Sequence, residues 1–152
     1  MMNYNKEMAN RVWQRVQAAQ PSQSLPNPQE TLLQLIEWEW LTADCYGRIT
    51  PRLSGQAAAI GKTLHSQKKE QVSCLKGLYI LLTGVAPTVP AKPIAPEPVH
   101  AMLRRCYGLQ MRCLAHYETK AQDAEHGVVY ARLAAQNKEQ CHKILALLGE
   151  KR

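Results

Sequence analysis

Apolar residues recur every three to four positions in four long stretches of this chain, and that spacing gathers them on one face of a helix. The pattern predicts helices over residues 28–50, 55–83, 99–122 and 123–148, and a shorter amphipathic helix over residues 5–19. No stretch alternates apolar and polar residues in the manner of strands joined by hairpin turns. The predicted fold class is therefore all-α.

Three of the long stretches have a well-defined face that we expect to line the core. On the first stretch this face is formed by Leu32, Leu35, Ile36, Glu39, Ala43, Tyr46 and Ile49. On the second it is formed by Ile60, Leu64, Cys74, Leu78 and Leu81. On the third it is formed by Leu103, Cys106, Gln110, Cys113, Leu114, Tyr117 and Ala121. Polar Glu39 and Gln110 thus stand in the middle of otherwise apolar faces.

Turn-forming residues mark the ends of these stretches. Asn27 followed by Pro28 is a helix start, and Gly84 is suited to a left-handed helix end. The segment after Gly84 contains Pro87, Pro90, Pro93, Pro96 and Pro98. Extended polyproline backbone rises ~3.1 Å per residue, so this segment is long enough to follow a helix from one end to the other. We therefore predict a long crossover, which would make the helices on its two sides parallel.

The helices predict one bundle domain over residues 28–152, preceded by an N-terminal arm over residues 1–27. A chain of 152 residues is long enough to bury a sizeable core. Its large apolar groups include Trp13, Trp38 and Trp40, more than a bundle of this size needs inside. We therefore expect a homodimer, the simplest closed assembly.

Composition narrows the classes of partner and compartment. The net charge of +7 is spread over all segments, which is typical of a solvated surface and does not predict a nucleic-acid partner. No apolar run approaches the ~20 residues that span a bilayer, and the N-terminus lacks the apolar core of a secretory signal. Five cysteines without CxxC spacing favour reduced thiols in the core. We expect a cytoplasmic protein with no membrane partner.

A repeated Lys-Glu-Gln carries the candidate chemistry. It occurs at residues 69–71 and again at residues 138–140, each time inside a predicted helix. In the second copy Glu139 and His142 are three positions apart, so on a helix both side chains can reach one metal ion. The first copy has Glu70 and Ser73 at the equivalent positions.

The two halves of the chain match at three pairs of positions. The sequence separation between Tyr46 and Tyr117 equals that between Glu39 and Gln110. The separation between Glu70 and Glu139 is nearly the same. A helical hairpin used twice and joined by the crossover explains why the three separations agree so closely.

Together these motifs resemble the ferritin-like superfamily, most closely its rubrerythrin-like and bacterioferritin-like branch, over about residues 28–148. In that family each hairpin supplies one Glu from its first helix and a Glu-x-x-His from its second. The resemblance implies a left-handed four-helix bundle with a carboxylate-bridged di-iron or di-manganese site in its middle.

Carried over residue by residue, the resemblance implies four metal ligands, Glu39, Glu70, Glu139 and His142. Ser73 replaces the first His of the family pattern, and Gln110 replaces the Glu of the third helix. Ser and Gln are weak, neutral ligands, so a complete two-metal centre is not expected.

Three interpretations of these residues stay open. The first is a metal-free bundle with a structural or interaction role, in which buried carboxylates are satisfied by hydrogen bonds. The second is the same bundle holding one iron, manganese or zinc ion. The third is a metal-dependent oxidoreductase or iron-handling protein with a modified di-iron or di-manganese centre. We favour a ferritin-like bundle protein with at most one ion, and we assign no catalytic residue.

Overall fold

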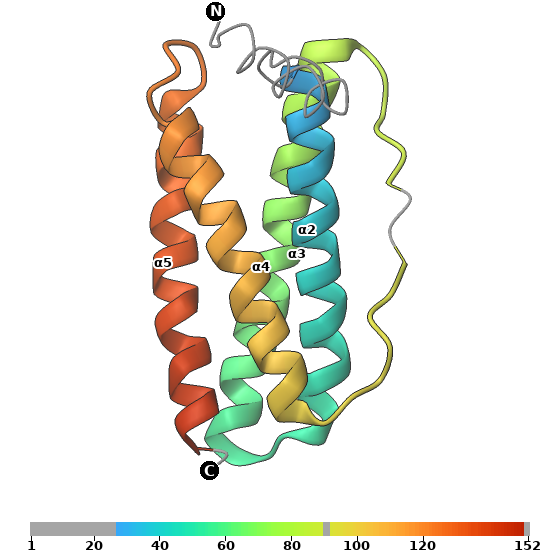
Figure 1. The fold of residues 1–152 in the computed structure, drawn as a ribbon, viewed down its shortest axis with the longest axis vertical. Helices are drawn as coiled ribbons and strands as arrows, with labels where there is room; N and C mark the ends of the chain where they lie inside the picture. The colour runs from blue at the N-terminus through green and yellow to red at the C-terminus, as the bar shows by residue number, and fades with distance from the viewer. Residues whose placement is uncertain (1–26, 90–91, 151–152) are drawn as a thin grey trace, which may run out of the picture. The chain divides into compact units, whose positions relative to one another are not determined.

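The computed structural model describes residues 27–89 and 92–150, with side chains to residue 149 (Figure 1). The described residues from Leu32 onward belong to one compact unit. The predicted helix over residues 5–19 lies outside the described residues. The described elements are α2 (Pro28–Ile49), the 3-10 turn η2 (Thr50–Arg52), α3 (Gly55–Thr83), α4 (Val99–Lys120) and α5 (Gly127–Glu150). The described residues contain no strand, so the all-α prediction is confirmed.

The start of α2 and the end of α3 follow the predicted local signals. The Asn27 Oδ1 atom accepts hydrogen bonds from the backbone N–H groups of Gln29 and Glu30, at 2.7 and 3.3 Å. This side chain satisfies donors that the first helical turn leaves free. Gly84 ends α3 with φ at 81°, and its N–H donates to the Ile80 carbonyl at 2.7 Å. Glycine adopts this left-handed conformation without steric cost.

The start of α5 differs from the prediction by several residues. The Asp123 carboxylate accepts hydrogen bonds from the backbone N–H groups of Glu125 and His126, at 2.6 and 3.0 Å. These bonds hold a turn in place of a first helical turn and lower the pKa of Asp123. Gly127 then begins the helix where a Cβ would lie 2.6 Å from the Ala121 carbonyl oxygen. The prediction failed because the helical pattern does not show this competition for backbone donors.

Helices α3 and α4 run in the same direction, and the described parts of the chain between them, residues 84–89 and 92–98, lie alongside α2 (Figure 1). Within this segment Ile94 is buried, and Val89 packs against a core cluster. Arg48 donates a hydrogen bond to the Ile94 carbonyl at 2.9 Å, and Arg52 donates one to the Glu97 carbonyl at 2.9 Å. Arg48 at the end of α2 and Arg52 in η2 therefore hold this segment against the bundle.

The core consists of two apolar clusters. The first cluster contains Leu32, Leu35, Ile36, Leu75, Leu78, Cys113, Leu114, Tyr117, Tyr130, Leu133 and Ala134. The second cluster contains Cys45, Tyr46, Ile49, Leu64, Ile94, Met102, Leu103, Cys106, Leu109, Ile144 and Leu147. The predicted face of α2 is buried throughout, and so is that of α4 except for Ala121, which follows the helix and is partly exposed. On α3 only Leu64 and Leu78 of the predicted face are buried. Ile60 and Cys74 are partly exposed, and the prediction was wrong for Leu81, which is 77% exposed.

Candidate functional site

A layer of polar side chains separates the two apolar clusters. On each helix the buried polar positions lie between the residues of one cluster and those of the other. They are Glu39 and Thr42 on α2, Lys68 and Gln71 on α3, Gln110 on α4, and Asn137 and Gln140 on α5. Buried polar groups are costly unless they are paired. The hydrogen bonds of this polar layer therefore show which of its groups are already paired and which could bind a ligand.

An ion pair lies at the centre of the polar layer. The Lys68 ammonium donates to Glu39 Oε1 at 2.7 Å and to Asn137 Oδ1 at 3.0 Å. Both charged side chains are completely buried. Asn137 also donates through Nδ2 to the backbone carbonyl of Gln110, at 3.2 Å. The ammonium thus joins a carboxylate of α2 to an amide of α5, and its charge offsets that of Glu39.

Two tyrosines connect the apolar clusters to the polar layer in opposite directions. The Tyr117 hydroxyl, from the first cluster, donates to Glu39 Oε2 at 2.6 Å. The Tyr46 hydroxyl, from the second cluster, donates to Gln110 Oε1. Burial raises the pKa of both phenols well above the usual value, and the charge of Glu39 raises that of Tyr117 further. Both hydroxyls are therefore hydrogen-bond donors over the whole neutral range.

Amide pairs complete the polar layer between α3 and α5. Gln71 Nε2 donates to Gln136 Oε1 at 2.9 Å, and Gln140 Nε2 donates to Gln67 Oε1 at 3.1 Å. Gln110 Nε2 donates to Gln140 Oε1 at 3.0 Å, which joins this set to α4. The two amide pairs connect the same two helices in opposite directions.

The polar layer is approximately symmetric between the two hairpins. The α3 residues Gln67, Lys68 and Gln71 match Gln136, Asn137 and Gln140 of α5, at the same separation that relates Glu70 to Glu139. Each tyrosine donates to the opposite hairpin, and so does each amide pair. The predicted duplication therefore corresponds to a two-fold pattern of contacts, with the Lys-Glu-Gln repeat inside it.

The structure does not bring the four predicted metal ligands together. Glu39 is fully buried as expected, whereas Glu70, Glu139 and His142 are exposed. The predicted convergence of these side chains in the bundle middle is wrong. The cause is helical register. Each residue turns the helix by about 100°, so the last residue of each Lys-Glu-Gln faces inward and the carboxylate before it does not.

No three His, Cys, Asp or Glu side chains come together among the described residues in a group that could hold a metal ion. Around Glu39 the neighbours are Lys68, whose ammonium has no lone pair for a cation, and Tyr117, whose hydroxyl donates its hydrogen to the carboxylate. Burial raises the pKa of the nearby Cys113 thiol, which disfavours the thiolate that a metal would need. The side chains of the polar layer do not fit the carboxylate-rich pattern implied by the resemblance.

Sequence reasoning missed Lys68, the only charged partner of Glu39 among the described residues. Its one sequence signal is the spacing of α3, where Leu64, Lys68, Val72 and Leu75 fall at intervals of three or four. A lysine in that series is easily taken for a surface residue, because buried lysines are rare. The same spacing on α5 contains Asn137 between buried Leu133 and Ile144.

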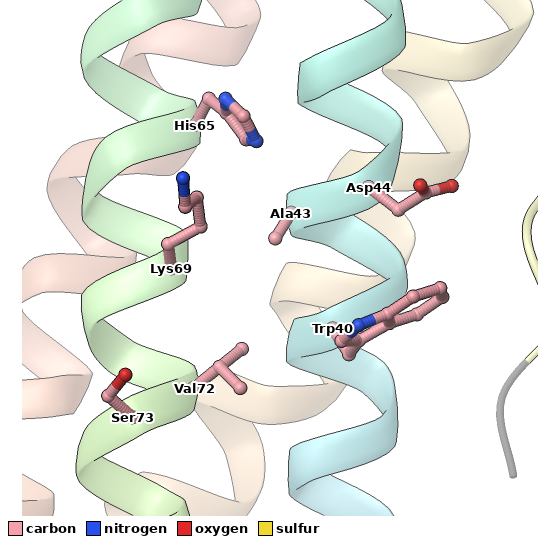
Figure 2. A pocket seen from close by; sticks show the side chains of 7 residues that line it. All are labelled: Trp40, Ala43, Asp44, His65, Lys69, Val72 and Ser73. Carbon is pink, nitrogen blue, oxygen red and sulfur yellow. The ribbon is translucent and has the colours of Figure 1, made fainter. Parts of the chain in front are cut away.

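A hollow of about 370 Å³ forms a groove on the outer side of α2 and α3 (Figure 2). It is lined by Trp40, Ala43, Asp44, His65, Lys69, Val72 and Ser73. Ser73, which the resemblance would place at a ligand position, is exposed in this groove and not in the core. Partial burial and the Lys69 charge lower the pKa of His65, while Asp44 acts in the opposite direction. The groove and the polar layer are separate features.

Comparisons with protein-family models, with curated proteins and with solved structures found no match to this chain. In the part of the chain that the structure describes, no helix is both long enough and apolar enough to cross a membrane.

Proposed function

We propose that this protein is a ferritin-like bundle with a structural or interaction role, in which a lysine ammonium stands where the family places metal. The observation that carries the proposal is the fully buried Lys68 between Glu39 Oε1 and Asn137 Oδ1. One ammonium matches the charge of one carboxylate, so the polar layer is neutral without a bound ion. Its hydrogen bonds connect all four helices.

Two features support the ferritin-like part of this proposal. Residues 84–89 and 92–98, between α3 and α4, lie alongside α2, and α3 and α4 run in the same direction (Figure 1). The polar layer repeats between the hairpins at nearly constant sequence separations. A duplicated hairpin joined by a long crossover is the topology of that superfamily.

The test is metal content and its dependence on Glu39. The protein is purified without chelator, loaded in turn with Fe²⁺, Mn²⁺ and Zn²⁺, and desalted before metal analysis. We expect far less than one ion per chain and no change in thermal stability when chelator is added, because the ammonium already balances the carboxylate. About one ion per chain that is lost on Glu39→Gln, but kept on the exposed control Glu70→Gln, would contradict the proposal and favour the metal-dependent oxidoreductase.

The homodimer also stays a proposal. Trp38 packs against both core clusters, whereas Trp40 lines the outer groove and remains partly exposed. Light scattering at micromolar concentration tests the assembly, and a stable monomer would remove this part of the proposal.

A further inference from the structure

A second hollow, about 280 Å³, lies where α2, α4 and the segment before α4 meet. Its apolar lining comes from Leu41, Ile94 and Leu109. Arg105 and Arg112 line it as well, and Gly108 lies between them on α4. Ligand pockets combine this kind of apolar wall with a small number of charged groups, and a hollow of this size suits a small ligand. None of its lining residues belongs to the polar layer.

The arginines leave one positive charge at this hollow. Arg105 donates to both carboxylate oxygens of Glu97, at 2.9 and 3.0 Å. The Arg112 guanidinium lies 5.9 Å from the centre of the Trp38 ring and forms no ion pair with a carboxylate of the described residues. Two guanidinium groups and one carboxylate therefore favour one further anionic group. The planar guanidinium matches a carboxylate by two parallel hydrogen bonds.

Gly108 keeps the space between the arginines open. It lies inside α4, where glycine is a poor helix former. A Cβ built on it would meet no atom within 4 Å, so no neighbour in the described chain requires a glycine here. Residues 105, 108, 109 and 112 share one face of the helix. Any side chain at position 108 would project into the hollow between Arg105 and Arg112.

We propose that this hollow binds a small amphiphilic carboxylate, with its apolar chain against Leu41, Ile94 and Leu109 and its head group on Arg112. Burial of the chain supplies the non-directional attraction. The guanidinium supplies the preference for an anion. This inference does not depend on the proposed function of the polar layer, because the two sites share no residue.

The experiment measures binding of sodium octanoate to the full-length protein by isothermal titration calorimetry. Acetate, which has the head group alone, and octylammonium, which has the same chain with the opposite charge, serve as matched probes. We expect octanoate to bind with a Kd of about 1 mM or tighter. Acetate and octylammonium should bind at least about tenfold more weakly, because each lacks one half of the recognition.

Two variants locate the site. Gly108→Leu should fill the hollow and weaken octanoate binding at least about tenfold while keeping the helical fold, since leucine is a better helix former than glycine. Gly77→Leu on α3 is the matched control, because it also meets no atom within 4 Å and lies outside the hollow. Arg112→Gln should weaken octanoate binding by about tenfold without affecting the fold.

Three results would overturn the proposal. The first is no heat of octanoate binding up to about 10 mM. The second is equal binding by Gly108→Leu and Gly77→Leu, which would place octanoate elsewhere. The third is equal affinity for octanoate and octylammonium, which would remove the role of the arginines. Circular dichroism of each variant separates loss of binding from loss of folding, and metal content remains an independent measurement.

Discussion

The two hairpins contribute differently to the polar layer although their contacts mirror each other. Glu39 on α2 and Lys68 on α3 carry the two buried charges, and both belong to the first hairpin. The equivalent positions of the second hairpin hold neutral Gln110 and Asn137. The second hairpin thus solvates an ion pair that the first provides. This difference shows that a symmetric set of helix positions can hold an asymmetric distribution of charge, provided that every charge has a partner.

Removing a buried charge of the first hairpin should have the largest effect on stability. Lys68→Met leaves the Glu39 carboxylate buried without its counter-charge, and we expect the free energy of unfolding to fall by about 3–5 kcal/mol. Urea denaturation monitored by circular dichroism measures the loss. Lys69→Met, at the exposed next position, is the control and should change stability by less than about 0.5 kcal/mol.

Removing both members of the ion pair tests whether the loss of stability in Lys68→Met comes from the unpaired Glu39 charge. Glu39→Gln combined with Lys68→Met should recover a large part of the loss, because the unpaired buried charge is then absent. If Lys68→Met costs no more than its control, the ion pair is not what stabilises the bundle middle.

Removing a neutral polar group of the second hairpin should reduce stability less. Asn137→Leu removes one acceptor from the Lys68 ammonium but leaves Glu39 in place. We expect a loss of about 1–3 kcal/mol, the usual cost of an unsatisfied buried polar contact. Urea denaturation under the same conditions gives the comparison, with exposed Lys138→Met as the control. A loss as large as that of Lys68→Met would mean that the second hairpin does more than solvate the pair.

The two buried tyrosines allow a direct comparison of a charged and a neutral hydrogen-bond acceptor. Tyr117 donates to a carboxylate, whereas Tyr46 donates to an amide oxygen. Hydrogen bonds to charged groups contribute about 1.5–3 kcal/mol and those between neutral groups about 0.5–1.5 kcal/mol. Tyr117→Phe should therefore destabilise the protein more than Tyr46→Phe in thermal or urea unfolding. The reverse order would mean that the Glu39 carboxylate does not carry the buried negative charge.

The smallest effect concerns the outer face, where partly exposed His65 on α3 corresponds to buried Ala134 on α5. Partial burial and Lys69 lower the pKa of His65 in the folded state. The unfolded chain then binds more protons, so the contribution of His65 is present above about pH 6.5 and is lost as the pH falls through the lowered pKa.

An NMR titration should give a His65 midpoint below the usual value, and Lys69→Gln should raise that midpoint because a like charge is removed. Because solvent screens the partly exposed His65, the matching change in stability should be small. A midpoint that Lys69→Gln leaves unchanged would contradict the role of the Lys69 charge.

The sequence by itself determined the helices and the duplication. Periodic apolar positions and local signals such as Asn27 and Gly84 act over a few residues, so they can be read without knowing what packs against them. The nearly constant separation between matching residues identified equivalent positions in the two hairpins. Burial of Glu39, Gln110, Tyr46 and Tyr117 was predicted correctly because each lies within an apolar face.

Only the tertiary structure decided which residue of Lys-Glu-Gln faces the core. On α3 and α5 the middle of the buried face is polar, so the apolar pattern is interrupted where the register matters most. A shift of one residue turns a side chain by about 100° and takes Glu70 and Glu139 to the surface. The partner of Glu39 could not be predicted from the sequence either. Lys68 is buried only through contacts with α2 and α5, and the residues that it contacts there are far away in the sequence.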